Sequence, residues 1–447
     1  MNDVVSRKPG LTGQIKDRLI QQALERKLKQ VEGNALPAAA HTGRAKTNIP
    51  EQHYRFNLHP GYQQLRIIND GAARLGVTSP FFKLHEGMAG SSTTIAEKAY
   101  VNYASYNYLN MSGDPAVVAA AKAAIDRYGT SVSASRLVSG ERPIHRELER
   151  AIADMYGVDD AITFVSGHAT NVSTIGHLFG PRDLVLHDEL IHNSVLQGIQ
   201  LSGARRVPFA HNDWEALDVI LTAQRHQFER VLIVLEGIYS MDGDFPDLPR
   251  FVEIKRRHHT FLMVDEAHSL GVMGRRGFGI REHFGLDGRD VDIWMGTMSK
   301  TLAGCGGYIA GETALVEHLK FLAPGFLYSV GMPPSVAAAS LTALQRMKDL
   351  PDRVSTLQSR GRFFLEQARS AGIDTGTSTG LAVVPVILGS SLKATRISTE
   401  LFKQGINVQP ILYPAVPEKS ARLRFFISCA HTEDEIRDTI CALSEIL

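Results

Sequence analysis

The chain has 447 residues, of which 44% are hydrophobic and 21% are charged, a composition that allows a full core in two or three domains. A formal net charge of +1 gives no electrostatic basis for binding nucleic acid or an acidic membrane surface. The three cysteines, Cys305, Cys429 and Cys441, form neither a metal-binding spacing nor a disulfide framework. Because the amino terminus is polar and no apolar run reaches spanning length, we expect a cytoplasmic protein.

Residues 1–98 are expected to form an amino-terminal extension with little catalytic signal. Apolar residues recur at helical spacing between residues 15 and 31, among lysines and arginines, which predicts an amphipathic helix. We favour a helix that lies on the main body, and a helix that docks a partner is the alternative. Residues 36–50 are rich in Ala, Pro, Gly and Thr and are predicted to be a linker.

Residues 99–330 are predicted to form the large domain, because strand and helix signals alternate there. A short strand is expected at 103–109. Helices are expected from Asp114-Pro115 to Arg127 and at 144–155, since proline suits a first helical turn. Five apolar runs predict strands at 161–165, 184–187, 231–236, 260–265 and 291–296. The alternation indicates an α/β fold with a mainly parallel sheet covered by helices on both faces.

A smaller α+β domain is predicted at 331–447, where the pattern changes. Helices are expected at 334–347 and 353–371, and strands at 382–388 and 423–428. A last helix should follow Thr432, whose side chain can cap it together with Glu435.

The stretch from Asp292 to Gly307 carries the strongest chemical signal. An apolar run is followed by small and hydroxyl residues, then Lys300, then glycines. Glycines let the backbone come close to a ligand, and a lysine in an apolar setting can lose its proton and act as an amine nucleophile. A surface lysine after a strand is the alternative that this stretch alone leaves open.

A second apolar run ends in Asp265, and His268 follows it. Ligands of open α/β sheets bind at the carboxyl ends of the strands, so Asp265 and Lys300 can meet at one crevice. An acid against a pyridinium nitrogen and a lysine on an aldehyde are what pyridoxal 5'-phosphate (PLP) needs. Asp-Glu-Ala-His, at 265–268, also occurs in helicases, but no lysine here follows a glycine, so a helicase phosphate loop is absent.

Two glycine-containing and hydroxyl-containing segments can contribute to the same crevice. Gly167 is expected to open a helix after the first strand of the large domain, and a helix amino terminus is a natural seat for phosphate. The segment 129–140 is small and hydroxyl-rich. It can be a flexible loop, or it can wrap a polar substrate.

Together these residues resemble the α-oxoamine synthases, PLP enzymes that share fold type I with aspartate aminotransferases. The resemblance runs from about Tyr103 to the carboxyl terminus. Its motifs stand in the family's order, at 107–109 (Asn-Tyr-Leu), 191–194 (Ile-His-Asn-Ser), 236–243 (Glu-Gly-Ile-Tyr-Ser-Met-Asp-Gly), 264–271 (Val-Asp-Glu-Ala-His-Ser-Leu-Gly), 297–300 (Thr-Met-Ser-Lys) and 421–424 (Ala-Arg-Leu-Arg). Serine palmitoyltransferase looks closer than 8-amino-7-oxononanoate synthase, and modules that work beside polyketide-type carrier proteins look closer still.

The resemblance implies the residues that contact the cofactor ring. Lys300 holds PLP and moves the α-proton, Asp265 pairs with the ring nitrogen, and His192 stacks on the ring face. His268 and Ser240 hydrogen-bond the phenolic oxygen. The implied catalytic residues are thus Lys300, His192, Asp265 and His268.

Phosphate and substrate contacts are implied in the same way. Thr297 and the backbone at Gly167 and His168 hold the phosphate, with Ser329 reaching in from a second subunit. The substrate residues implied are Asn107 and Arg424 on the amino-acid carboxylate and Ser135 beside its side chain. The sequence departs from the family at two positions: His168 stands where an aromatic residue is common, and Gly331 replaces a common serine.

The resemblance implies a decarboxylative condensation of a small L-amino acid with an acyl thioester, giving an α-aminoketone, carbon dioxide and a free thiol. Glycine, alanine and serine stay open as the amino acid. The donor can be acyl-coenzyme A or an acyl carrier protein, and the helical extension favours the carrier protein. A homodimer with shared active sites is expected. An aminotransferase of the same fold and a catalytically silent carrier-protein docking module are the alternatives.

Overall fold

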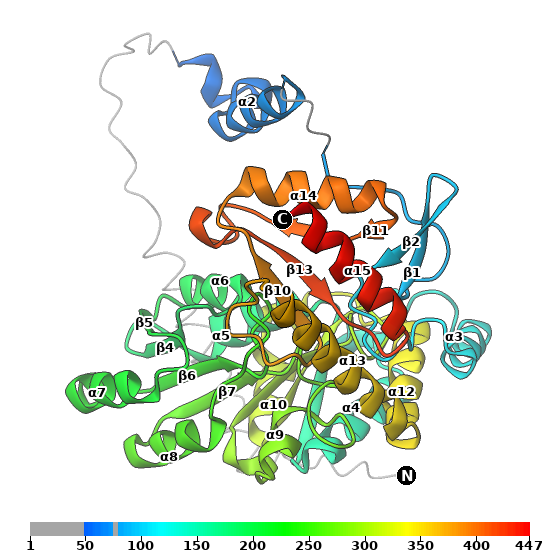
Figure 1. The fold of residues 1–447 in the computed structure, drawn as a ribbon. Coiled ribbons are helices and arrows are strands. Elements are labelled where there is room, and N and C mark those ends of the chain that lie inside the picture. Colours follow the sequence, from blue (N-terminus) through cyan, green and yellow to red (C-terminus); the bar gives the residue numbers. More distant parts are fainter. Residues whose placement is uncertain (1–48, 75–78) are drawn as a thin grey trace, which may run out of the picture. The chain divides into compact units, whose positions relative to one another are not determined.

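The computed structural model describes residues 49–74 and 79–447, which belong to two compact units divided after Gly71 (Figure 1). In the first unit, η1 (Glu51–His53) and η2 (Phe56–Leu58) precede α2 (Pro60–Arg74), which begins in this unit and is not among the predicted elements. The helix predicted at 15–31, and the predicted linker up to residue 48, lie outside the described residues.

Seven strands form the central sheet of the second unit, in the order β3-β9-β8-β7-β6-β4-β5. Their bounds are β3 (Asp160–Phe164), β4 (Leu184–Asp188), β5 (Arg205–Phe209), β6 (Val231–Glu236), β7 (Phe261–Asp265), β8 (Ile293–Thr297) and β9 (Gly307–Gly311). β9 runs antiparallel to β3 and β8, and the other neighbouring pairs are parallel. The predicted mainly parallel α/β sheet is therefore confirmed.

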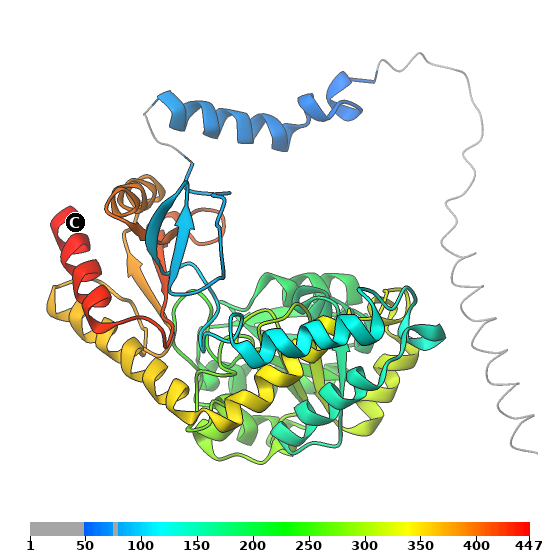
Figure 2. The same ribbon diagram turned by 90° about the vertical axis from the view of Figure 1, so that its right-hand side faces the viewer.

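Helices cover both faces of this sheet, because each central strand is apolar on both sides. In β6, Val231, Ile233 and Leu235 pack into one buried cluster, while Leu232 and Val234 pack into another. The first face is covered by α3 (Pro115–Tyr128), α4 (Pro143–Tyr156), α7 (Trp214–Gln224), α8 (Leu248–His258), α9 (Gly279–Phe284) and α12 (Pro334–Asp349). The second face is covered by α5 (Gly167–Leu178), α6 (Asn193–Ser202), α10 (Thr313–Leu322) and α11 (Pro324–Leu327). Figure 2 shows α3 and α12 side by side.

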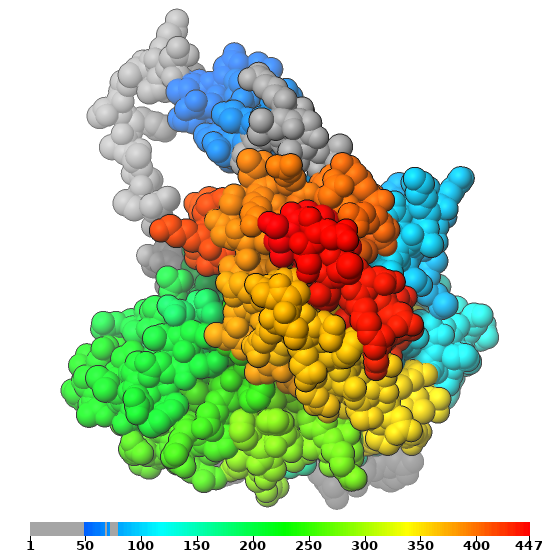
Figure 3. All heavy atoms as spheres, in the orientation of Figure 1, coloured from blue at the N-terminus to red at the C-terminus, as the bar shows by residue number. Residues whose placement is uncertain are grey.

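The carboxyl-terminal part builds a second layer of structure around its own core. One antiparallel sheet has the order β10 (Val383–Ile387), β13 (Arg422–Phe426), β12 (Gln409–Ile411). Three helices accompany it: α13 (Pro351–Ser370), α14 (Ser391–Lys403) and α15 (Glu433–Ile446). Thr432 and Glu435 form the predicted capping box of α15. In Figure 3 these orange and red segments gather on one side of the green sheet region.

A third sheet joins segments that are far apart in sequence. β1 (Ser92–Ile95) pairs with β2 (Lys98–Asn102), and β2 pairs with β11 (Ile406–Asn407). The predicted boundary between residues 98 and 99 therefore falls inside a strand. The division at 98/99 and 330/331 stays a prediction.

The strand predicted at 103–109 is wrong. These residues form turns and irregular backbone, although Tyr103, Tyr108 and Leu109 are fully buried. An apolar run indicates that its residues are buried. Buried residues need not have an extended backbone, so this run did not predict a strand correctly.

Short 3-10 and π turns complete the second unit. They are η3 (Arg136–Gly140), η4 (Arg225–Gln227), η5 (Gly288–Asp290) and η6 (Glu418–Ser420). Among the described residues, no helix combines the length and apolar character that a membrane crossing needs.

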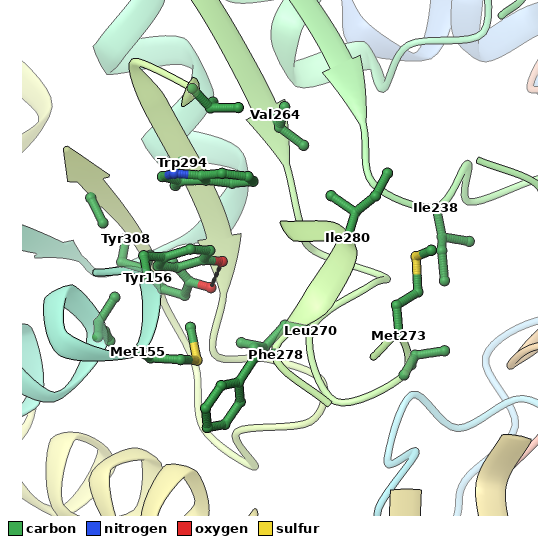
Figure 4. Packing of buried hydrophobic residues seen from close by; sticks show 14 of the residues in the cluster. Met155, Tyr156, Ile238, Val264, Leu270, Met273, Phe278, Ile280, Trp294 and Tyr308 are labelled. Atoms are coloured by element: carbon green, nitrogen blue, oxygen red, sulfur yellow. Dashed lines mark hydrogen bonds between the residues drawn. The ribbon is translucent and has the colours of Figure 1, made fainter. Parts of the chain in front are cut away.

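Trp294 is fully buried in the larger core, next to Tyr156 (Figure 4). Its ring stacks on Tyr156 with ring centroids 5.0 Å apart, and its Nε1 donates a hydrogen bond of 2.8 Å to the carbonyl oxygen of Gly288. The hydroxyl oxygens of Tyr156 and Tyr308 lie 2.9 Å apart beside it. This cluster joins α4 to the middle of the sheet.

We expect Trp294→Ala to lower the free energy of unfolding by about 3–5 kcal/mol, because it empties a fully buried site. The urea midpoint, followed by circular dichroism, measures the loss. Val219→Ala is the control, since Val219 is 69% exposed on α7 and its loss should stay within about 0.5 kcal/mol. Equal midpoints for the two variants would contradict a central role for Trp294.

Candidate active site

A cavity of about 330 Å³ opens at the carboxyl ends of β6, β7 and β8. These strands end in Glu236, Asp265 and Thr297, and parallel strands bring such ends to one edge of the sheet. The predicted site residues that line this cavity are Gly167, His168, His192, Ser240, Asp265, His268, Thr297, Lys300 and Arg424. Residues from six separate stretches of sequence thus face one space.

Lys300 lies in the turn that follows β8, with its Nζ 5.7 Å from the ring centroid of Tyr106. Burial lowers the pKa of Lys300 to about 8, against the raising effects of Asp265 and Glu236, while the Arg424 guanidinium lowers it further. A sizeable fraction of the amine is therefore neutral near physiological pH and can act as a nucleophile or accept a proton.

Asp265 is 4% exposed and both of its carboxylate oxygens accept hydrogen bonds. Oδ1 accepts from the backbone N–H of Ala267, and Oδ2 accepts from Nδ2 of Asn171, each at 2.9 Å. The carboxylate of Asp265 is therefore held in one orientation where it lines the cavity.

His268 and Arg424 enter the cavity from different layers of the fold. His268 follows β7, and its Nδ1 lies 2.7 Å from the hydroxyl oxygen of Tyr108. Burial lowers the pKa of His268 well below its usual value, and the charges of Lys300 and Arg424 add to this effect, so the ring is neutral. Arg424 comes from β13 and donates to the carbonyl oxygen of Ser240 at 3.1 Å.

A close approach between α5 and β8 shapes one end of the cavity. A Cβ on Gly167 would lie 2.8 Å from Oγ1 of Thr297, so glycine is needed where α5 begins. Ser166 caps α5 by accepting from the N–H of Ala169. The first N–H groups of a helix have no partner inside it and favour an anion. Thr297 Oγ1 donates to the carbonyl oxygen of Gly306 at 2.8 Å. The hydroxyl of Thr297 must therefore rotate before it can donate to a phosphate.

Three predicted site residues do not line this cavity. Asn107 faces a neighbouring cavity of about 500 Å³, and its amide is already bonded to Ala89 and Ser112. Its predicted contact with a carboxylate stays a prediction, and it requires those bonds to rearrange. Ser329 donates to the carbonyl oxygen of Gly325 at 2.7 Å, and Ser135 begins η3. Both lie on neighbouring segments, because the N–H of Gly331 donates to the carbonyl oxygen of Ala134.

Glu236 also lines the cavity, although its sequence motif predicts no role for it. It pairs in register with Asp265 on the adjacent strand, so the two carboxyl groups lie on the same side of the sheet. Burial and the Asp265 carboxylate raise the pKa of Glu236 well above its usual range. One of its oxygens accepts from the N–H of Ser240, and the other is buried without a hydrogen-bond partner. Glu236 is therefore a neutral acid beside an anion. Glu236 ends a strand, as Asp265 does, and this position is the sequence feature that could have identified it as a site residue.

His211 is a second such residue and supports the loop that carries Ser240. Its Nδ1 donates to Asp188 at 2.9 Å and its Nε2 donates to Asp244 at 3.0 Å. Asp244 also accepts from the hydroxyl of Thr377 at 2.6 Å. The link therefore joins the end of β4 to the segment after β6 and to the carboxyl-terminal part. Nothing in the local sequence predicts it.

Comparison with known proteins adds the family. Residues 98–443 match the family model for aminotransferase class I and II. The chain is 39% identical over 354 residues to the 8-amino-7-oxononanoate synthase of Fervidobacterium nodosum, covering 78% of this chain and 89% of that protein. It is 37% identical over 377 residues to that of Symbiobacterium thermophilum, covering 84% and 95%.

Solved structures show the same relationship. A serine palmitoyltransferase from S. paucimobilis, solved with PLP and myriocin, has a TM-score of 0.83 at 30% identity, covering 86% of this chain and 97% of that one. An 8-amino-7-oxononanoate synthase from Francisella tularensis has a TM-score of 0.68 at 26% identity, covering 77% and 97%. Of these two structures, the serine palmitoyltransferase is the more similar in backbone and in sequence, whereas the two synthases named above share more sequence identity with the chain than either.

The chain belongs to the aminotransferase class I and II family and has the fold of the type I PLP transferases. Within that family it is an α-oxoamine synthase, a PLP-dependent enzyme that condenses an amino acid with an acyl thioester and releases carbon dioxide.

The cavity fits PLP on its own geometry. The anion of Asp265 and the amine of Lys300 face the same space, and the start of α5 supplies an anion seat that a Cβ at Gly167 would fill. Arg424 lines the same cavity, where its guanidinium can bind a carboxylate.

We expect His211→Gln to destabilise the protein most at low pH. Burial lowers the pKa of His211, but its two carboxylate partners outweigh burial and raise the pKa to about 10. A histidine whose pKa is raised by folding contributes stability fully below its ordinary value of about 6.5, and this contribution is lost as pH rises through about 10.

Urea midpoints of the wild type and His211→Gln between pH 6 and pH 10 test this expectation. The difference between the two proteins should shrink steadily as pH rises. The same series with Val219→Ala, which changes no titrating group, should show a constant difference. A His211→Gln difference that grows with pH would contradict the charged bridge.

Proposed function

We propose that Lys300 and Asp265 bind opposite ends of one PLP ring in the 330 Å³ cavity. We propose further that this site condenses a small L-amino acid with an acyl thioester. The observation that carries the proposal is that a buried amine and a buried carboxylate, from the turn after β8 and the end of β7, line the same cavity. The product is an α-aminoketone, with carbon dioxide and a free thiol.

When bound, PLP supplies a ring that takes up negative charge from the amino acid's α-carbon. Asp265 supports this as a fixed anion that keeps a proton on the ring nitrogen. Neutral Lys300 Nζ accepts the α-proton, since its pKa is lowered to about 8. His268 and Ser240 orient the phenolic oxygen. Thr297 and the start of α5 at Gly167 and His168 orient the phosphate.

Substrate contacts come from the carboxyl-terminal layer and from a loop. Arg424 binds the carboxylate of the amino acid, because it lines the cavity and a guanidinium suits a bidentate contact with a carboxylate. Asn107 is the second proposed carboxylate contact, and Ser135 is proposed to border the amino-acid side chain. The small hydroxyl of Ser135 suits glycine, alanine or serine.

The acyl donor is proposed to enter through the neighbouring cavity of about 500 Å³. This cavity shares Tyr106, Ser299 and Lys300 with the first one, so a thioester placed there reaches the amine. Polar groups such as Asn102 and Gln409 line it beside Met88, which suits a chain with amide groups. Acyl carrier protein and coenzyme A present the same amide-containing arm, and we propose the carrier protein as the partner. Cytoplasmic location stays a prediction.

A homodimer with shared sites is proposed from the surface around η3 and α11. Large apolar side chains are exposed there, including Val138 (79%) and Tyr328 (86%), with Leu137, Phe321, Leu322 and Val330. A second copy of the chain would cover them. Ser135 and Ser329 lie on these segments, and we propose that Ser329 reaches the cavity of a partner subunit.

We expect Lys300→Ala to lose the visible absorbance of bound PLP and all ketone formation, because the amine that binds the aldehyde is gone. Assays of carbon dioxide and free thiol, with mass spectrometry of products from glycine, alanine and serine and both donors, measure the reaction. Lys393→Ala, at an exposed position on α14, should behave as wild type. An active, coloured Lys300→Ala protein contradicts the proposal. Ketone-free amino-group transfer by the wild type would favour an aminotransferase, which releases neither carbon dioxide nor thiol.

Shared sites predict complementation between two inactive variants. Lys300→Ala and Ser329→Trp, refolded or co-expressed together, should recover about a quarter of wild-type activity, because a mixed dimer keeps one intact site. Lys300→Ala mixed with Asp265→Asn is the control and should stay inactive, since both residues face one chain's cavity. Equal activity of the two mixtures would show that Ser329 does not cross between subunits.

A further inference from the structure

His192 begins α6, and its side chain acts as the cap of that helix. Its Nδ1 accepts a hydrogen bond of 3.3 Å from the backbone N–H of Ser194 and lies 2.7 Å from the Ser194 hydroxyl oxygen. A backbone N–H can only donate, so this bond favours Nδ1 as an acceptor, but at 3.3 Å it is long and needs the support of a second donor. The single proton of a neutral imidazole then sits on Nε2.

Asn171 supports this arrangement from α5. Its Nδ2 donates to Asp265 Oδ2 and to Ser194 Oγ, both at 2.9 Å. A carboxylate repels an amide oxygen, so Asp265 fixes which way the amide of Asn171 faces. Because Ser194 Oγ accepts from Asn171, its own proton is free to point at Nδ1 of His192. Asn171 and Ser194 are both almost fully buried, which removes competing water.

We propose that a hydrogen-bonded chain from Asp265 through Asn171 and Ser194 holds His192 as the neutral Nε2–H tautomer, with that proton directed at the bound ligand. Asn171 and Ser194 are then positioning residues for the reaction. The inference deepens the proposed function and rests on it for its chemical meaning, since an Nε2–H can donate to the carbonyl oxygen of the acyl donor.

The surroundings of His192 keep the ring neutral. Burial lowers its pKa, the carboxylate of Asp265 raises it, and the cations of Lys300 and Arg424 lower it again, as does His168. Among the described residues, these groups and the neutral acid of Glu236 are the titratable side chains that line the same cavity with it, apart from the hydroxyl of Tyr106 and the neutral ring of His268. Nε2 has no hydrogen-bond partner in the described part of the chain, so it is available to a ligand.

Nitrogen NMR of the holoenzyme with ¹⁵N-labelled histidine tests the tautomer directly. His192→Gln identifies the signal of His192 by its loss. We expect the wild type to show a protonated Nε2 and an unprotonated Nδ1 at neutral pH. A protonated Nδ1 would overturn the proposal. A wild type with the expected tautomer but no ketone product would refute the proposed function and leave the hydrogen-bonded chain intact.

Variants of Ser194 separate positioning from packing. Ser194→Ala removes the hydroxyl and should give a mixture of tautomers, with kcat lower by roughly tenfold and KM for the amino acid unchanged. Ser194→Thr keeps the hydroxyl and should restore the wild-type spectrum and kcat. Asn193→Ala is the matched control in the same first turn of α6, because Asn193 is exposed and its side chain accepts from Gln197, which is not part of the network. A wild-type spectrum and kcat in Ser194→Ala would overturn the positioning role proposed for the hydrogen bonds from Asp265 to His192.

Discussion

The structure of the site depends on the attraction between buried charges at the carboxyl edge of the sheet. Burial makes the charged forms of Lys300 and Arg424 costly and lowers the pKa of both side chains. Asp265 offsets part of that cost, and it is itself fixed by Asn171 and by the N–H of Ala267. The acids and bases around them carry no further net charge, because the pKa of Glu236 is raised and the pKa of His268 is lowered. The site therefore holds one firm anion, and its other members are poised to donate or accept protons.

Much of this architecture could be predicted from the sequence, because the central strands are short apolar runs and their polar residues come at the ends. Asp265 ends one predicted strand and Thr297 directly follows another, and this alone brings them to one edge. The strands β5 and β9 could not be predicted in the same way. β5 carries two arginines and Pro208 at the edge of the sheet, and β9 is flanked by Gly307 and Gly311, so neither resembles a buried strand.

The supporting residues of the site could not be predicted, since their contacts join distant segments. Asn171 meets Asp265 across 94 residues, and His211 meets Asp244 across 33. A buried asparagine on a helix and a histidine in a loop have no periodicity that marks a function. The resemblance to a family supplies roles for the residues that contact the ligand, and the fold alone shows which groups hold those residues in place.

The chain from Asp265 to His192 has a consequence for how the site responds to its ligand. Asn171 uses both protons of Nδ2, one on Asp265 and one on Ser194, so a change in charge at the carboxylate is felt at the hydroxyl. Ser194 receives one of these bonds on its oxygen and lies with that oxygen 2.7 Å from Nδ1 of His192. The backbone N–H of Ser194 donates to the same nitrogen, so two groups of one residue act on it. The tautomer of His192 is thus linked to the carboxylate of Asp265 through Asn171 and Ser194, although Asp265 and His192 lie on different segments of the site.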